Sequence, residues 1–232
     1  MKIEEVAGSI GRVVFDEYGR EIGILVSVSA DAEGYVEYVE IKVEDLRLEK
    51  VEGERVKITD GKLTVIPEWK HAAIKLIDSL DRSYKRKKGV EEMIAKGEIP
   101  GEVLKELERK LTEQIKKLKM KAKEVEAEIK KRIEKIDYQN MHIARAMAVL
   151  QMTYFSGEVG ERQFEQGMTH LKKLKETLTK EKEEAKEILD KLSKTLELAS
   201  GSKITVKTPA KKHEAPKTTN VPEAFTVKVV DG

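Results

Sequence analysis

The residue types that most often do chemistry are sparse in this chain of 232 residues. It has no cysteine, which excludes disulfides, a thiolate nucleophile and a Cys-ligated metal site. His142 and His170 fall on different predicted helices, and neither has a second ligand residue three or four positions away. We find no acid–base pair, nucleophile constellation or nucleotide loop with the required spacing. We therefore expect no enzymatic activity, no cofactor and no bound metal.

Two clusters of basic residues are the candidate contacts with phosphate groups. The first comprises Arg82, Lys85, Arg86, Lys87 and Lys88, and the second comprises Lys116, Lys117, Lys119, Lys121 and Lys123. Most such runs are solvated helix faces with pairs of opposite charge four residues apart. Contact with anionic lipid or with DNA is the functional alternative, and either contact would weaken as salt is added.

Residues 220–232 contain an alternating pattern that is typical of a β-strand. Phe225, Val227 and Val229 would lie on one side of the strand, with Thr226 and Lys228 on the other. Because a lone strand is unstable in water, we expect it to add to the exposed sheet edge of a partner. The alternative is that it pairs with the sheet of its own chain or of a neighbouring subunit.

Composition predicts an extended molecule with a modest core. Charged residues make up 38% of the chain and hydrophobic residues 39%, and the net charge is only +2. Residues 1–66 hold 9 Lys and Arg against 15 Asp and Glu, whereas residues 67–199 hold 30 against 25. No apolar run is long enough to span a bilayer, and the acidic start does not resemble a signal peptide. We expect a soluble, unprocessed, cytoplasmic protein.

Residues 1–66 are predicted to form a small β domain. Short runs rich in Val and Ile recur about every ten residues, separated by turns at 16–20, 31–34 and 59–61 that need glycine at positive φ. Five or six short strands in fewer than 70 residues are best satisfied by a closed barrel, because closure removes exposed edges.

The first two strands carry a resemblance to a known domain. The string from Ile10 to Val14, followed by Asp16 and the run from Tyr18 to Val26, is similar to the opening of PRC-barrel domains. That pattern is a glycine-led strand, a glycine turn and a second glycine-led strand. PRC barrels usually serve as docking modules, so the resemblance implies a fold more than a function.

Residues 67–199 are predicted to form a rod of three helices. Pro67 fits the first turn of a helix that runs to about residue 96. From Leu104 to Tyr154, fourteen steps of the core pattern cover 50 residues, which predicts one helix of roughly 80 Å over 102–155. The break at 156–160 predicts an antiparallel hairpin with a third helix. The longest helix must then protrude past a partner, and an uncovered apolar stripe favours self-association.

Residues 200–219 are rich in Ser, Thr, Lys and Pro and are predicted to be a flexible linker. The whole chain is therefore predicted to be a multidomain α+β protein. Its parts are a PRC-type β-barrel at 1–66, a coiled-coil rod at 67–199, this linker, and a strand motif at 220–232.

This order of parts, ending in the pattern Val-Pro-x-x-aromatic-x-Val-x-Val, resembles the family of the crenarchaeal cell division protein CdvA. The resemblance implies that the terminal strand binds the ESCRT-III homologue CdvB by adding to its winged-helix-like domain. The residues that would carry this contact are Val221, Pro222, Phe225, Val227 and Val229. It also implies filaments that recruit CdvB to the membrane at mid-cell, and DNA binding.

We therefore predict a noncatalytic cell-division scaffold that self-associates, presents a strand to CdvB and works at the membrane of the mid-cell. Arg82, Lys85, Arg86, Lys87 and Lys88 are the candidate contacts with the membrane surface or with DNA. The alternative is a DNA-binding, nucleoid-organising coiled-coil protein, which the Lys-rich rod motivates.

Overall fold

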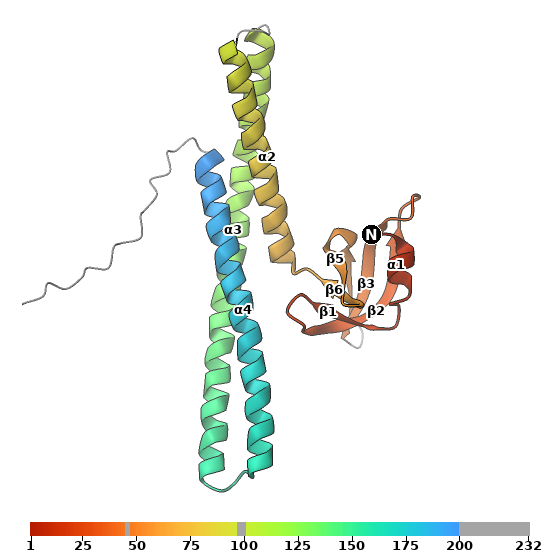
Figure 1. The fold of residues 1–232 in the computed structure, drawn as a ribbon, viewed down its shortest axis with the longest axis vertical. Coiled ribbons are helices and arrows are strands. Elements are labelled where there is room, and N and C mark those ends of the chain that lie inside the picture. Colours follow the sequence, from red (N-terminus) through yellow and green to blue (C-terminus); the bar gives the residue numbers. More distant parts are fainter. Residues whose placement is uncertain (45–46, 97–100, 200–232) are drawn as a thin grey trace, which may run out of the picture.

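The computed structural model describes residues 1–44, 47–96 and 101–199, and shows a small curled sheet beside a rod of long helices (Figure 1). The N-terminal part contains α1 (Ile3–Ala7), β1 (Val13–Asp16), β2 (Glu21–Ala30), β3 (Val36–Glu44), β4 (Arg47–Glu52), the 3₁₀ turn η1 (Gly53–Arg55), β5 (Val56–Thr59) and β6 (Lys62–Val65). The rod contains α2 (Glu68–Lys96), α3 (Gly101–Phe155) and α4 (Glu161–Ala199). The predicted α+β class is confirmed.

The six strands form one sheet in the order β4-β3-β2-β1-β6-β5. Only β1 and β6 are parallel, and the other neighbours are antiparallel. Glycine occupies the expected positive-φ positions in the three predicted turns, at Gly19, Gly34 and Gly61. At Gly53 the backbone passes so close to β3 that an added Cβ would lie 2.0 Å from the Val36 carbonyl oxygen.

The closed barrel that we expected is not confirmed, because the sheet is open. Its two edge strands, β4 and β5, do not pair with each other, although the three residues of η1 alone connect them. The sheet must therefore curl strongly. β4 is rich in charged residues, at 47, 49, 50 and 52, and β5 is only four residues long. Both features protect an exposed edge without closure.

One end of the core of the sheet is covered by the short helix α1, which the sequence did not predict. Val6 of α1 is fully buried together with Val14, Leu25 and Val39. The first residues of the chain are also tied to the turn before β3, since the backbone N–H of Ile3 donates to the Gly34 carbonyl at 2.9 Å. The amphipathic start of the chain thus covers one opening of the curled sheet.

In the rod, α2 and α4 lie along different parts of the longer helix α3 (Figure 1). α2 packs on the first part of α3, α4 packs antiparallel on its last part, and the two overlap only in the middle. α2 continues through Gly89 without a break. Gly157, with φ of 78°, ends α3, and the ring of Phe164 stacks on Tyr154 with centroids 4.3 Å apart across the hairpin. The predicted antiparallel hairpin of α3 and α4 and the protruding long helix are confirmed.

The overlap creates a three-helix core. It contains Leu76 and Leu80 from α2, Ile129 from α3, and Ile188 and Leu192 from α4. Small side chains bring the helices close, because Ala73, Ala122 and Ala185 are fully buried there. Among the described helices, none combines the length and the apolar composition needed to cross a bilayer.

Candidate functional site

The turn between β1 and β2 projects toward the rod and is ordered by its own aspartate. The Asp16 carboxylate accepts hydrogen bonds from the backbone N–H groups of Tyr18 and Arg20, both at 2.9 Å. The same carboxylate accepts a bond of 2.6 Å from the Arg20 Nε. The turn therefore holds the Tyr18 ring and the Arg20 guanidinium in fixed positions.

Arg20 reaches across to a buried carboxylate of α4. Its Nη1 lies 2.8 Å from the Oε2 of Glu181, whose side chain is 0% exposed. Arg132 of α3 binds the same carboxylate with two parallel bonds, Nε to Oε1 at 2.6 Å and Nη2 to Oε2 at 2.8 Å. Glu181 thus joins the sheet, α3 and α4 at one point.

The charge of Glu181 is balanced within the protein. Burial by itself would raise the pKa of Glu181, but the hydrogen bond from Arg132 and the charges of Arg20 and Arg132 outweigh it. The pKa of Glu181 therefore lies below its ordinary value, and the carboxylate is ionised at neutral pH.

A second set of contacts lies one helical turn further along α4. The Tyr18 hydroxyl donates to the Oε2 of Glu184 at 2.6 Å, and burial together with this bond raises the pKa of Tyr18. Lys70 of α2 lies 2.5 Å from the other Glu184 oxygen and 2.6 Å from Glu17 of the turn. We call the seven residues Glu17, Tyr18, Arg20, Lys70, Arg132, Glu181 and Glu184 the junction network.

The junction network fixes the direction of the sheet relative to the rod. Each charged group in it meets an opposite charge within 2.8 Å. Buried charge networks contribute little net stability, but leaving one member unpaired is costly, so they favour one arrangement over others. The arrangement is suited to orientation and offers no free nucleophile or base.

Two hollows border the junction. One, of about 230 Å³, lies between sheet and rod and is lined by Arg20, Trp69 and Glu181 among others. A wider groove of about 630 Å³ lies where the β1–β2 turn faces the hairpin of α3 and α4. It brings together His142 and His170, which the sequence placed on different helices.

The sequence reasoning did not find the junction network, although one signal for it was present. The apolar stripe of α4 runs through Leu174, Leu178, Ala185, Ile188 and Leu192, with steps of three or four residues except between 178 and 185. The stripe requires a buried residue in that gap, and Glu181 occupies it. A charge at a core position of a helix predicts a buried partner.

The predicted basic residues lie on α2, on the part of the rod beyond the sheet. Arg82, Lys85, Arg86 and Lys88 are exposed, and Lys87 is half-buried. Lys85 pairs with Asp81 at 2.6 Å and Lys87 lies 3.7 Å from Glu91, so part of their charge is balanced along the helix. Arg86 lines a hollow together with Lys110 of α3.

The second basic cluster, on α3, differs in its pairing. No residue in the described parts of the chain makes an ion pair with the lysines of this cluster, which are Lys116, Lys117, Lys119, Lys121 and Lys123.

The residues predicted to bind CdvB lie outside the described residues. They are Val221, Pro222, Phe225, Val227 and Val229.

The fold and the junction define an elongated, two-part protein in which a small sheet is held at a set angle on a three-helix rod. A family model, described as a CdvA-like coiled-coil domain, matches residues 68–218, and the chain belongs to that family. The match begins at the first residue of α2.

A similar protein is the cell division protein A of Sulfolobus acidocaldarius. The two are 28% identical over 191 residues, which cover 82% of this chain and 79% of the relative. No solved structure matches the chain.

Proposed function

We propose that this protein is a scaffold for cell division that links a self-associating rod to a captured ESCRT-III subunit. The observation that carries the proposal is the similarity to cell division protein A, which extends over four-fifths of the chain and so must include most of the rod and at least part of the sheet. Such a scaffold would act in the cytoplasm, at the membrane of the mid-cell. An elongated fold, with the charges of the junction network paired at the joint between sheet and rod, supports a structural role over a catalytic one.

Recruitment is assigned to residues 220–232. The family match ends at residue 218, two positions before this motif begins. Val221, Pro222, Phe225, Val227 and Val229 would place alternate side chains on the edge of the winged-helix-like domain of CdvB, with backbone hydrogen bonds supplying affinity. Many strands presented by one polymer would bind together far more tightly than a single strand.

Self-association is assigned to the ends of the rod. Where only two helices pair, large apolar side chains remain exposed, including Met152 and Phe155 at the hairpin end and Val103 and Leu107 at the other. A second copy of the chain would cover them and supply the missing third or fourth helix. The sheet, of the PRC type by resemblance, is the candidate docking module.

Contact with an anionic surface is assigned to the basic residues of α2, Arg82, Lys85, Arg86, Lys87 and Lys88. Four of the five are exposed on the part of the rod beyond the sheet, which supports contact with a membrane. The second basic cluster on α3, which makes no ion pair with any described residue, would add to that contact. The same charges support the second candidate function, a DNA-binding organiser of the nucleoid.

Calorimetric titration of the CdvB winged-helix-like domain tests the recruitment. We expect the full chain to bind, and a chain that ends at Thr219 not to bind. Phe225→Ala should weaken binding at least tenfold, whereas the control Thr226→Ala, on the opposite side of the strand, should change it little. Binding that is equal with and without residues 220–232 would contradict the proposal.

Reversing the charge of Arg82, Lys85, Arg86, Lys87 and Lys88 to Glu separates the two candidate functions. A division scaffold should lose retention on vesicles of anionic lipid and keep its affinity for CdvB. The nucleoid organiser is the correct function if the wild type binds duplex DNA but neither the vesicles nor CdvB, and the variant loses the binding to DNA.

A further inference from the structure

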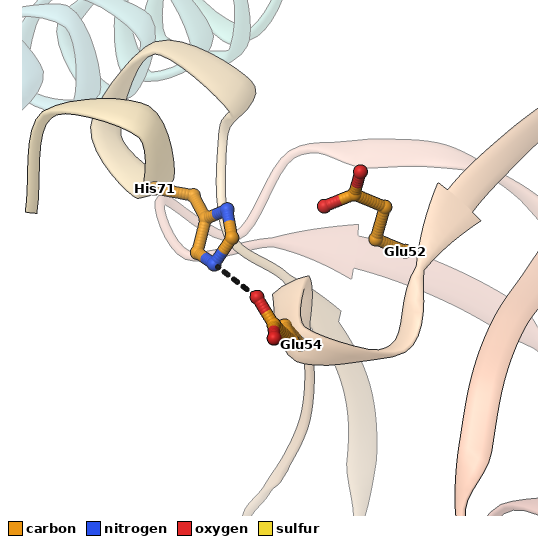
Figure 2. A group of neighbouring side chains, drawn as sticks. All are labelled: Glu52, Glu54 and His71. Carbon is orange, nitrogen blue, oxygen red and sulfur yellow. Dashed lines mark ion pairs between the residues drawn. The ribbon is translucent and has the colours of Figure 1, made fainter. Parts of the chain in front are cut away.

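The fold brings two carboxylates and an imidazole together on the outer side of the joint between sheet and rod. Glu52 ends β4, Glu54 lies in η1, and His71 lies in the first turns of α2 (Figure 2). One potential ligand atom of each residue lies within 4.8 Å of those of the other two. His71 Nε2 and Glu54 Oε2 are 3.5 Å apart.

Backbone constraints hold the three residues in place. The close approach of Gly53 to Val36 fixes the η1 turn, so Glu52 and Glu54, on either side of that glycine, remain beside the start of α2. The backbone N–H of His71 donates to the Pro67 carbonyl at 3.0 Å, which fixes its place in the first turn of the helix. The His71 side chain is only 18% exposed and has little freedom to turn away.

A cation already occupies part of this site. The Lys75 ammonium lies 2.6 Å from Glu54 Oε2, the same oxygen that faces His71. Glu54 Oε2 therefore already binds one cation at a position next to the imidazole, and a carboxylate oxygen of Glu52 lies within 4.8 Å of both other potential ligand atoms.

We propose that Glu52, Glu54 and His71 bind a divalent transition-metal ion of the zinc class, in competition with Lys75. An imidazole with two carboxylates suits Zn²⁺ and its neighbours, whereas Ca²⁺ and Mg²⁺ prefer sites built from oxygen alone. Bonds of about 2.0–2.2 Å in a tetrahedron require donor atoms about 3.4 Å apart. Rotation of the two exposed Glu side chains closes the remaining distance, and water completes the coordination.

The bound ion would join the two parts of the molecule. Its ligands come from the sheet, through β4 and η1, and from the rod, through α2. An ion that binds only the folded arrangement stabilises it by RT ln(1 + L/Kd), where L is the free ion concentration. The site would thus reinforce from outside the orientation that the junction network sets from inside.

Calorimetric titration of Zn²⁺ into chelator-treated full-length protein tests the proposal, with the visible absorption of bound Co²⁺ as a second readout. We expect one ion per chain. His71→Asn and, independently, Glu54→Gln should each weaken binding at least tenfold. The control variants His142→Asn and His170→Asn should leave the affinity unchanged, because these histidines lie in the groove on the other side of the turn.

Lys75→Met gives the sharpest result, because it removes the competing ammonium and should strengthen Zn²⁺ binding several-fold. Far-UV circular dichroism of each variant confirms that it is folded. The proposal is overturned if the wild type binds no Zn²⁺ at millimolar concentration, or if Glu54→Gln binds as tightly as the wild type. Weaker binding by folded Lys75→Met would also overturn it.

Discussion

The middle of the rod and its two ends are built from the same kind of helix but differ in what covers them. In the middle, three helices and the sheet meet, and Ala122, Ile129 and Ala185 are fully buried. At the hairpin end two helices pair, and Phe155 is 75% exposed. The middle therefore sets stability and shape, whereas the ends retain apolar surface for association.

The largest expected effect comes from a cavity in the middle. Ile129→Ala should lower the free energy of unfolding by about 2–5 kcal/mol, because three packed helices cannot collapse into the space. Its control is Ile94→Ala at the end of α2, where the isoleucine is 42% exposed and the loss should be below about 1 kcal/mol. Urea unfolding followed by circular dichroism measures both, and equal losses would mean that the ends are as well covered as the middle.

The next effect comes from the junction network. Glu181→Ala leaves Arg20 and Arg132 without their shared carboxylate and should cost about 2–4 kcal/mol, less than for fully buried partners because both arginines are partly exposed. Glu183→Ala, at an exposed position of the same helix, is the matched control. Urea unfolding midpoints compare the two, and a loss no larger than that of the control would show that the network is not needed.

The pH dependence of stability should reveal the same network with a smaller effect. The hydrogen bond from Arg132 and the two arginine charges hold the pKa of Glu181 below its ordinary value despite burial, and Lys70 and Tyr18 do the same for Glu184. Both groups therefore stabilise the fold above their unfolded pKa of about 4.3. This contribution is lost as pH falls through the lower folded pKa.

Urea midpoints measured between pH 7 and pH 3 test this expectation. The wild type should lose stability below about pH 4.3. In Glu181→Gln, which cannot titrate at that position, the loss should be smaller. An identical acid dependence in the two proteins would assign the effect to other carboxyl groups.

Local patterns predicted the elements well, because turns and helix hairpins depend on neighbouring residues. The three glycine turns, the unbroken pattern of α3 and the reversal near Gly157 all followed from residue type and spacing. The burial of Val6 from α1 in the core of the sheet, and the open form of the sheet, did not follow in this way, because both depend on which segments meet in space. An alternation of Val and Ile predicts strands but not whether the last strand reaches the first.

The candidate sites were harder to predict for the same reason. Glu181 meets Arg20 and Arg132 across separations of more than a hundred and of 49 residues. Glu52, Glu54 and His71 come from three elements, β4, η1 and α2, with no shared motif. Only the gap in the apolar stripe of α4 pointed to a buried charge, and nothing in the sequence pointed to its partners.

Sedimentation velocity tests most directly the claim that the ends of the rod associate while the middle holds the fold. The double variant Met152→Gln and Phe155→Gln removes apolar surface at the hairpin end without adding charge. We predict that the wild type forms assemblies and that this variant, which keeps the other end of the rod, forms clearly smaller ones with an unchanged unfolding midpoint. The control Met120→Gln, also exposed but in the middle of the rod, should assemble normally. Assembly of the double variant to the same extent as the wild type would contradict the account.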